Sequence, residues 1–218
     1  KSGSAGKGGN IDDNAFYLGS YATWFSTDGM YMDNVLQYGN HDARLSASGN
    51  NGSHTVKGHT LTASTEIGKA FRLGASAWSL EPQVQLIYQY SDFDDSTLGG
   101  STKTKVRLDT ADAFTARVGL RLKADYDTRH GKVQPYGRVN LWQGLGSKDK
   151  TRFSNAVATT TLESSQQYSS TEVAAGLSWN IDRDLQVYGE LGTQFNNGGH
   201  KSQVEAPVNA SIGFKKSF

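Results

Sequence analysis

Apolar and polar residues alternate along most of the chain, and single runs of this alternation are long. In residues 78–90, Trp78, Val84 and Tyr90 fall on one face and Glu81 and Gln83 on the other. A period of two predicts a β-strand with one face in an apolar environment. Strands of soluble proteins average about 5 to 6 residues, whereas strands that cross a membrane have about 9 to 11. The length of the alternation therefore favours membrane-spanning strands.

The same pattern predicts nine strands in sequence order. They cover residues 14–25, 30–38, 60–71, 78–90, 113–124, 133–142, 172–181, 185–195 and 207–218. Residues 1–13, KSGSAGKGGNIDD, are polar and rich in glycine, so we predict a loop there. We expect residues 14–218 to form one β-domain, because no change in composition marks a linker within them.

The connections between these strands alternate between short and long. Tight turns are expected near Thr27, Gly74, Thr128 and Asp182, and long polar loops separate them. Outer-membrane barrels have this asymmetry, and single-chain bacterial barrels have an even number of strands. Nine strands are odd in number, so the sequence predicts an all-β, antiparallel transmembrane β-barrel of the outer-membrane type that is incomplete and has meander topology.

Composition limits the alternatives. The chain has 22 basic and 21 acidic residues, which gives no basic stripe for nucleic acid, and it has no cysteine for a disulfide or a thiolate metal site. It has no spacing of metal ligands, so neither a metal nor another cofactor is expected. A mean hydropathy of -0.56 is also compatible with a soluble β-sandwich. The 25 Gly, 10 Tyr and 4 Trp against 3 Pro favour the barrel.

Six stretches resemble one known family in its order and at its spacing. They are YLGSYATWFSTDGMYMDNVLQYG, WSLEPQVQLIYQYSDF, FTARVGLRLKADYD, VQPYGRVNLWQ, TEVAAGLSWNIDRDLQVYGELGTQF and VNASIGFKKSF. The family is the translocator (β) domain of bacterial autotransporters, of the pertactin and diffuse-adherence adhesin kind. The resemblance extends from Tyr17 to Phe218.

This resemblance implies a fold, a location and partners. The family's domain is a twelve-stranded outer-membrane barrel whose pore is plugged by a helix leading to an N-terminal passenger. By this resemblance the chain carries strands four to twelve and lacks the helix and the first three strands. The implied function is type V secretion of its own passenger. The implied partners are that passenger, outer-membrane lipids and the barrel assembly machinery.

The end of the chain resembles the signal that this machinery recognises. The signal residues would be Ile212, Phe214 and Phe218, which alternate along the terminal strand. An unpaired terminal strand can offer its backbone edge for strand addition while its alternate apolar side chains fill pockets. The family usually has an aromatic residue two positions before the last one, where this chain has Lys216. A second interpretation is that Phe218 anchors the strand at the membrane interface.

Charged residues on the polar faces of the strands are predicted to face the lumen. They are Glu66, Glu81, Arg117, Arg121, Arg138, Glu172 and Glu190. One interpretation is that these charges hydrate the pore and hold a plug or a passing chain. The other is that they pair with one another, because confined charges need partners.

An outer-membrane barrel enzyme with an active site at its rim is the alternative function, and a passive pore is a third. A protease or lipase would need a histidine beside a serine or aspartate at the tops of adjacent strands. His41 and His200 are the candidates, and the sequence shows no evident partner for either. No catalytic residue is therefore predicted.

Overall fold

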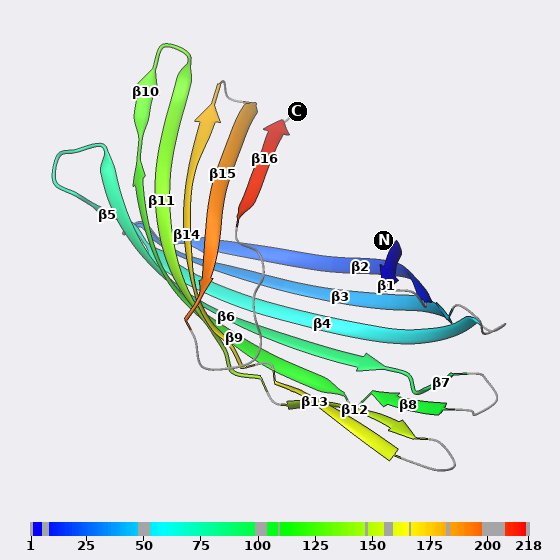
Figure 1. Ribbon diagram of the computed structural model, residues 1–218. Coiled ribbons are helices and arrows are strands. Elements are labelled where there is room, and N and C mark those ends of the chain that lie inside the picture. Colours follow the sequence, from blue (N-terminus) through cyan, green and yellow to red (C-terminus); the bar gives the residue numbers. More distant parts are fainter. Residues whose placement is uncertain are drawn as a thin grey trace.

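The computed structural model describes most of the chain and shows a curved, open β-sheet (Figure 1). The described residues are 2–5, 9–47, 53–98, 104–108, 110–146, 148–154, 159–165, 167–181, 184–197 and 208–216. This part of the chain contains no helix, and so none that is long and apolar enough to cross a membrane.

Nine long strands form the body of the sheet, in agreement with the number predicted. They are β2 (Gly9–Phe25), β3 (Met30–Ala47), β4 (Ser53–Lys69), β6 (Trp78–Phe93), β9 (Ala111–Ala124), β11 (Gly131–Gly144), β14 (Ser169–Asn180), β15 (Leu185–Asn196) and β16 (Asn209–Lys216). Each pairs antiparallel with the next, so the predicted meander is confirmed. Three short strands extend it, with β1 (Ser2–Ala5) on β2, β5 (Phe71–Arg72) on β6 and β10 (Tyr126–Thr128) on β11.

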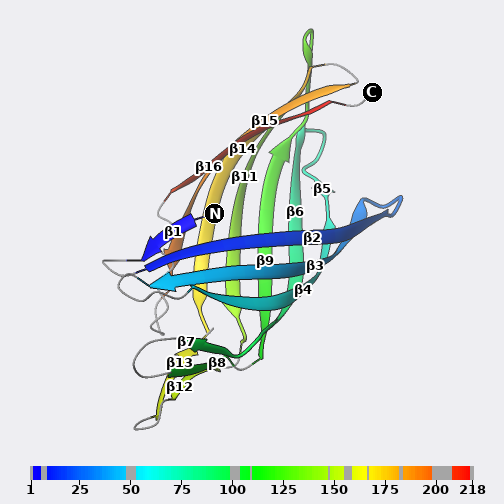
Figure 2. The ribbon, with the colours of Figure 1, turned by 90° about the vertical axis from the view of Figure 1, so that its right-hand side faces the viewer.

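The sheet does not close on itself within the described residues. Its pairing runs from β1 at one edge to β16 at the other, and these two edges are not paired with each other. Figure 2 shows the resulting half-barrel. An open strand edge leaves backbone N–H and C=O groups without partners.

The two ends of the sheet differ in their connections. At one end the chain makes tight turns, where Gly29, Gly74 and Gly131 have positive φ angles of 83°, 64° and 104°. Glycine suits these positions because it alone adopts such angles without steric cost. At the opposite end, β7 (Ser96–Leu98), β8 (Thr104–Leu108), β12 (Lys148–Ser154) and β13 (Thr159–Ser165) form a separate four-stranded sheet. Figure 2 shows this sheet at the lower end, away from the turns.

The loops are the part of the fold where prediction and structure differ. Where a loop over residues 1–13 is predicted, Ser2–Ala5 instead forms a strand that pairs with the start of β2, and residues 1 and 6–8 lie outside the described residues. The polar stretch 41–57 continues β3 and β4, and its tip at residues 48–52 lies outside the described residues. The loops 91–112 and 144–169 contain the strands of the second sheet. Polar alternation is a weak signal, because both faces of such a strand carry polar residues.

The sheet is apolar on one side and polar on the other, with burial reversed relative to a soluble protein. On what we call the outer face, Val84 and Val118 are 59% and 56% exposed. On the inner face, Glu81 and Arg117 are only 2% and 6% exposed. Side chains converge on the concave side of a curved sheet, so the polar face is the concave one. A strand whose outer side chains are apolar and whose inner side chains are polar suits the wall of a barrel, which has lipid on one side and a water-filled lumen on the other.

Candidate functional site

The seven charged residues singled out in the sequence all belong to ion pairs on the inner face. Arg117 Nη2 lies 2.6 Å from Glu66 Oε2, and Arg121 Nη2 lies 2.6 Å from Glu81 Oε1. Arg138 Nη2 lies 2.9 Å from Glu172 Oε1 and 2.7 Å from Glu190 Oε1. The structure therefore supports the pairing interpretation for this set, whose partners come from neighbouring or next-neighbouring strands.

Neutral side chains also bind the carboxylates of Glu66 and Glu81, and with the ion pairs they form a hydrogen-bonded network. The Tyr31 hydroxyl donates to Glu66 Oε1 at 2.6 Å and lies 3.1 Å from Glu81 Oε1. The Gln83 amide donates to Glu81 Oε1 at 2.8 Å and to the Tyr31 hydroxyl at 2.9 Å. These bonds join β3, β4 and β6 across the inner face. Charge-assisted hydrogen bonds of this kind are stronger than neutral ones.

A second group of neutral side chains surrounds Glu172. The Asn140 amide and the Trp142 indole N–H both donate to Glu172 Oε2 at 2.9 Å. The guanidinium of Arg117 lies 5.4 Å from the centroid of the Trp142 ring, in a cation–π contact. Asn140 is fully buried. A buried carboxylate is stable only when its lone pairs have donors, and here they do.

Sequence reasoning missed the neutral members of this network. The charged residues alone do not predict Tyr31, Asn140 and Trp142, nor Tyr136, whose hydroxyl donates to Glu190 Oε2 at 2.8 Å. Their signal was the alternation itself, because Asn140 and Trp142 stand two and four positions after Arg138 and so share its face. A search restricted to charged residues does not find these four neutral side chains.

His41 has partners that the sequence did not reveal. Its Nδ1 lies 3.5 Å from Asp13 Oδ2, and its Nε2 lies 3.3 Å from Thr60 Oγ1. The Tyr17 ring meets the imidazole edge-on, with centroids 5.5 Å apart. These contacts connect β2, β3 and β4 near the end that carries the long connections. His200, the other candidate, lies outside the described residues.

Two of the three proposed signal residues lie on the outer face of β16. Ile212 pairs with Gly189 and Phe214 with Val187, and they are 85% and 77% exposed. Phe218 lies outside the described residues. Exposed apolar side chains on an edge strand are available to lipid or to another strand.

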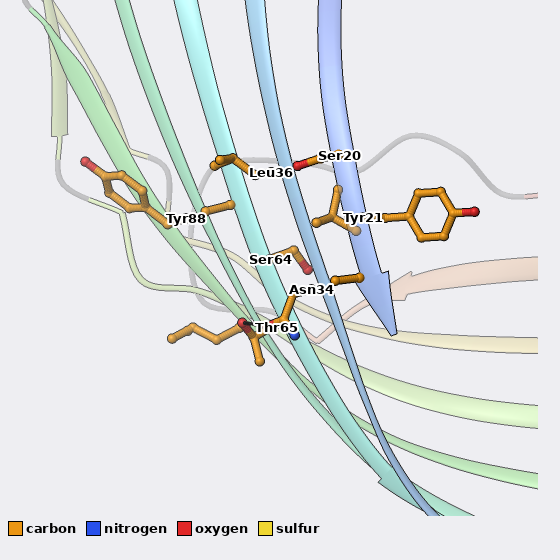
Figure 3. Close-up of a pocket in the computed structure, with 11 residues that line it drawn as sticks. Ser20, Tyr21, Asn34, Leu36, Ser64, Thr65 and Tyr88 are labelled. Atoms are coloured by element: carbon orange, nitrogen blue, oxygen red, sulfur yellow. Dashed lines mark hydrogen bonds between the residues drawn. The ribbon is translucent and has the colours of Figure 1, made fainter. Parts of the chain in front are cut away.

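The outer face contains a shallow hollow of about 500 Å³ over β2, β3, β4 and β6. In Figure 3 the Leu36 and Tyr88 side chains extend from one side of the sheet and Tyr21 from the other. Inside the hollow the Thr65 hydroxyl donates to Asn34 Oδ1 at 2.9 Å. This hydrogen bond pairs two polar side chains on the otherwise apolar outer face. Among the described residues, no group of three His, Cys, Asp or Glu side chains could hold a metal ion.

The family model for the autotransporter β-domain matches residues 1–192. The chain belongs to the autotransporter β-domain family. Its similarity to curated autotransporters covers nearly its whole length. The adhesin/invasin TibA of Escherichia coli is 27% identical over 97% of this chain, and the pertactin autotransporter of Bordetella bronchiseptica is 27% identical over 85%. The chain spans about a fifth of the length of either relative, 21% and 20%.

Solved autotransporter β-domains share the fold. The β-domain of the Bordetella autotransporter BrkA superposes with a TM-score of 0.67 at 20% identity, over 96% of this chain and 75% of that one. The transport unit of AIDA-I from Escherichia coli gives a TM-score of 0.65 at 15% identity, over 96% of this chain and 68% of that one. Autotransporter β-domains are outer-membrane barrels, so this chain belongs to the wall of an outer-membrane barrel. In such barrels the inner face lines the lumen and the long connections are extracellular.

Proposed function

We propose that this chain forms the larger part of the wall of a pore through which the passenger of its own parent protein reaches the cell surface. The observation that carries the proposal is the paired inner face. Its arginines and glutamates neutralise one another within hydrogen-bonding distance. A lumen lined in this way is hydrated but has little net charge, so it neither traps nor repels a passing polypeptide by charge.

Closure of the barrel requires further strands, and we propose that they come from the parent chain upstream of Lys1. The edges at β1 and β16 are open. Lipid offers no hydrogen bonds, so each unsatisfied backbone group there costs several kcal/mol. The β-domain of BrkA supports this proposal, because the present chain covers 75% of it.

Two further partners belong to the same proposal. The barrel assembly machinery would recognise β16 through its open edge and through Ile212 and Phe214. Outer-membrane lipids would cover the exposed aliphatic side chains of the outer face. We further propose that the domain performs no chemistry on a small substrate, in keeping with relatives named as adhesins and autotransporters.

Surface exposure of the passenger tests the translocation proposal. The parent protein would be produced with an epitope tag in its passenger, in a Gram-negative host, with and without residues 209–216. Intact cells would be probed with antibody and with external protease. The tag should be accessible only when β16 is present. Passenger display without β16, or an assembled barrel with the passenger retained inside the cell, would contradict the proposal.

A further inference from the structure

The four-stranded extracellular sheet has a basic face. Strands β8 and β12 carry five basic residues and one acidic residue, Asp149. The basic residues are Lys105, Arg107, Lys148, Lys150 and Arg152. Arg152 pairs with Arg107 in the register of the two strands. Because residues two apart share a face, all five positions lie on one face of the sheet and Asp149 lies on the other.

The acidic groups beside this face do not balance it. Asp95 Oδ2 lies 3.1 Å from Arg107 Nε and 3.4 Å from Lys105 Nζ. The hydrogen bond from Arg107 lowers the pKa of the Asp95 carboxyl, so this group stays ionised. Glu163 in β13 occupies the position opposite Lys150. A single carboxylate thus serves both basic residues of β8, in a chain whose formal net charge is only +1.

The register of β8 and β12 places two positive charges opposite each other, which is unfavourable. Arg107 and Arg152 stand directly opposite each other on neighbouring strands, and like charges in this arrangement destabilise a sheet. Both side chains are exposed, and Arg107 shares its acidic partner, Asp95, with Lys105. An anion bound across the pair would remove the repulsion. Arginine binds phosphate oxygens through two parallel N–H donors.

The position of the sheet identifies the nearest anionic surface. The outer face near this end carries the rings of Tyr88 and Phe114, whose centroids are 4.8 Å apart. Aromatic side chains are enriched at membrane interfaces. Only Asp94 and Asp95 separate the end of β6 from the start of β7. The second sheet therefore begins two residues beyond a strand of the barrel wall, at the end where the outer leaflet lies.

We propose that the basic face of β8 and β12 binds phosphate groups on lipid headgroups of the outer leaflet. The contact would hold the second sheet against the membrane surface around the pore mouth. It requires only the outer-membrane location of the chain and does not depend on passage of a passenger. Each basic residue near an anionic membrane surface raises the binding affinity by about fivefold.

The test uses barrel purified from outer membranes and lipid A that carries two phosphates. Binding in detergent would be followed by native mass spectrometry for the wild type and for the R107Q/R152Q variant. We expect the variant to bind the lipid roughly 10- to 30-fold more weakly, given the contribution of two basic residues. The R107K/R152K variant keeps the charge and should retain most of the affinity. Retained heat-modifiable mobility in gels would show that each variant is folded.

A matched control removes two charges from the other end of the molecule. Arg129→Gln with Lys132→Gln changes the turn side of β11 and should alter binding less than twofold. Lipid A without phosphates should not bind measurably to the basic face. Equal binding by R107Q/R152Q, or by the dephosphorylated lipid, would overturn the proposal.

Discussion

Tyr136 in β11 lies directly opposite Gly176 in β14, and its ring occupies the space that a side chain at residue 176 would need. The hydroxyl of the same ring donates to Glu190 Oε2 at 2.8 Å, one strand further on. The glycine therefore lets the tyrosine lie flat across β14 and reach the ion pairs. Tyr31 with Gly68 and Tyr188 with Gly213 repeat the arrangement.

Gly176→Ala should consequently destabilise the barrel. A methyl group there would meet the Tyr136 ring and the Gly189 carbonyl, and overpacking of this kind costs about 1 to 3 kcal/mol. Equilibrium unfolding in urea with lipid vesicles would measure the change. Gly137→Ala is the control, because the nearest atom to its new methyl is 3.8 Å away. If both alanine variants had equal stability, the space above Gly176 would have no role.

Removal of Arg138 should be more harmful than removal of any exposed cation. Its guanidinium lies between Glu172 and Glu190. Arg138→Met leaves two carboxylates close together without a cation, and loss of one partner of a buried pair costs about 3 to 5 kcal/mol. The free energy of unfolding would be compared with that of Arg129→Met in an exposed turn, where a change within about 0.5 kcal/mol is expected. A small loss for Arg138→Met would mean that water screens these charges.

The strands and the ion-pair residues could be predicted from sequence for the same physical reason. Lipid on one side and a hydrated lumen on the other impose alternation on every residue of a spanning strand, as in Val118 and Arg117. The alternation also assigned Glu66, Glu81 and Arg117 to one face. The alternation could not identify the ion-pair partner of each residue. Which charges lie close together depends on the register of neighbouring strands, and that register is set by contacts between the strands.

The extracellular parts could not be predicted in the same way. Residues 2–5, the start of β2 and the segments around Lys105 and Arg152 extend beyond the part of the sheet expected to contact lipid, so nothing imposes apolar alternation on them. Their polar composition resembles that of a loop, and their strands form only by pairing with one another. The contacts of His41 were also hidden, since Asp13 and Thr60 are 28 and 19 positions away. Such proximity comes from topology alone.

The turn between β2 and β3 should show a local dependence on pH. A hydrogen bond from Lys69 Nζ, at 2.6 Å, is the main cause that lowers the pKa of Asp28 from 3.8 to about 2. A lowered pKa stabilises the fold above the unfolded value, and that contribution disappears as the pH falls from about 4 toward 2. Carbon NMR of the Asp28 carboxyl would follow the titration. Lys69→Met should move the midpoint back toward 3.8, and an unchanged midpoint would exclude Lys69 as the cause.

The last prediction concerns the outer face of β16. Ile212 and Phe214 are exposed there, next to the open edge of the sheet. Ile212→Arg places a charge toward lipid, which costs about 2 to 4 kcal/mol at the middle of the bilayer. We expect less assembled barrel in outer-membrane fractions, measured as the heat-modifiable form, and a milder loss for Phe214→Ala.

Substitutions on the opposite face of β16 separate this effect from a general defect of the strand. Lys215 is on the inner face and pairs with Gln186, so Lys215→Ala should leave assembly nearly unchanged. Because that variant keeps the backbone edge and the outer-face side chains, it changes neither feature that a partner strand or lipid would contact. If Lys215→Ala reduced assembly as much as Ile212→Arg, recognition of β16 would not depend on its apolar face.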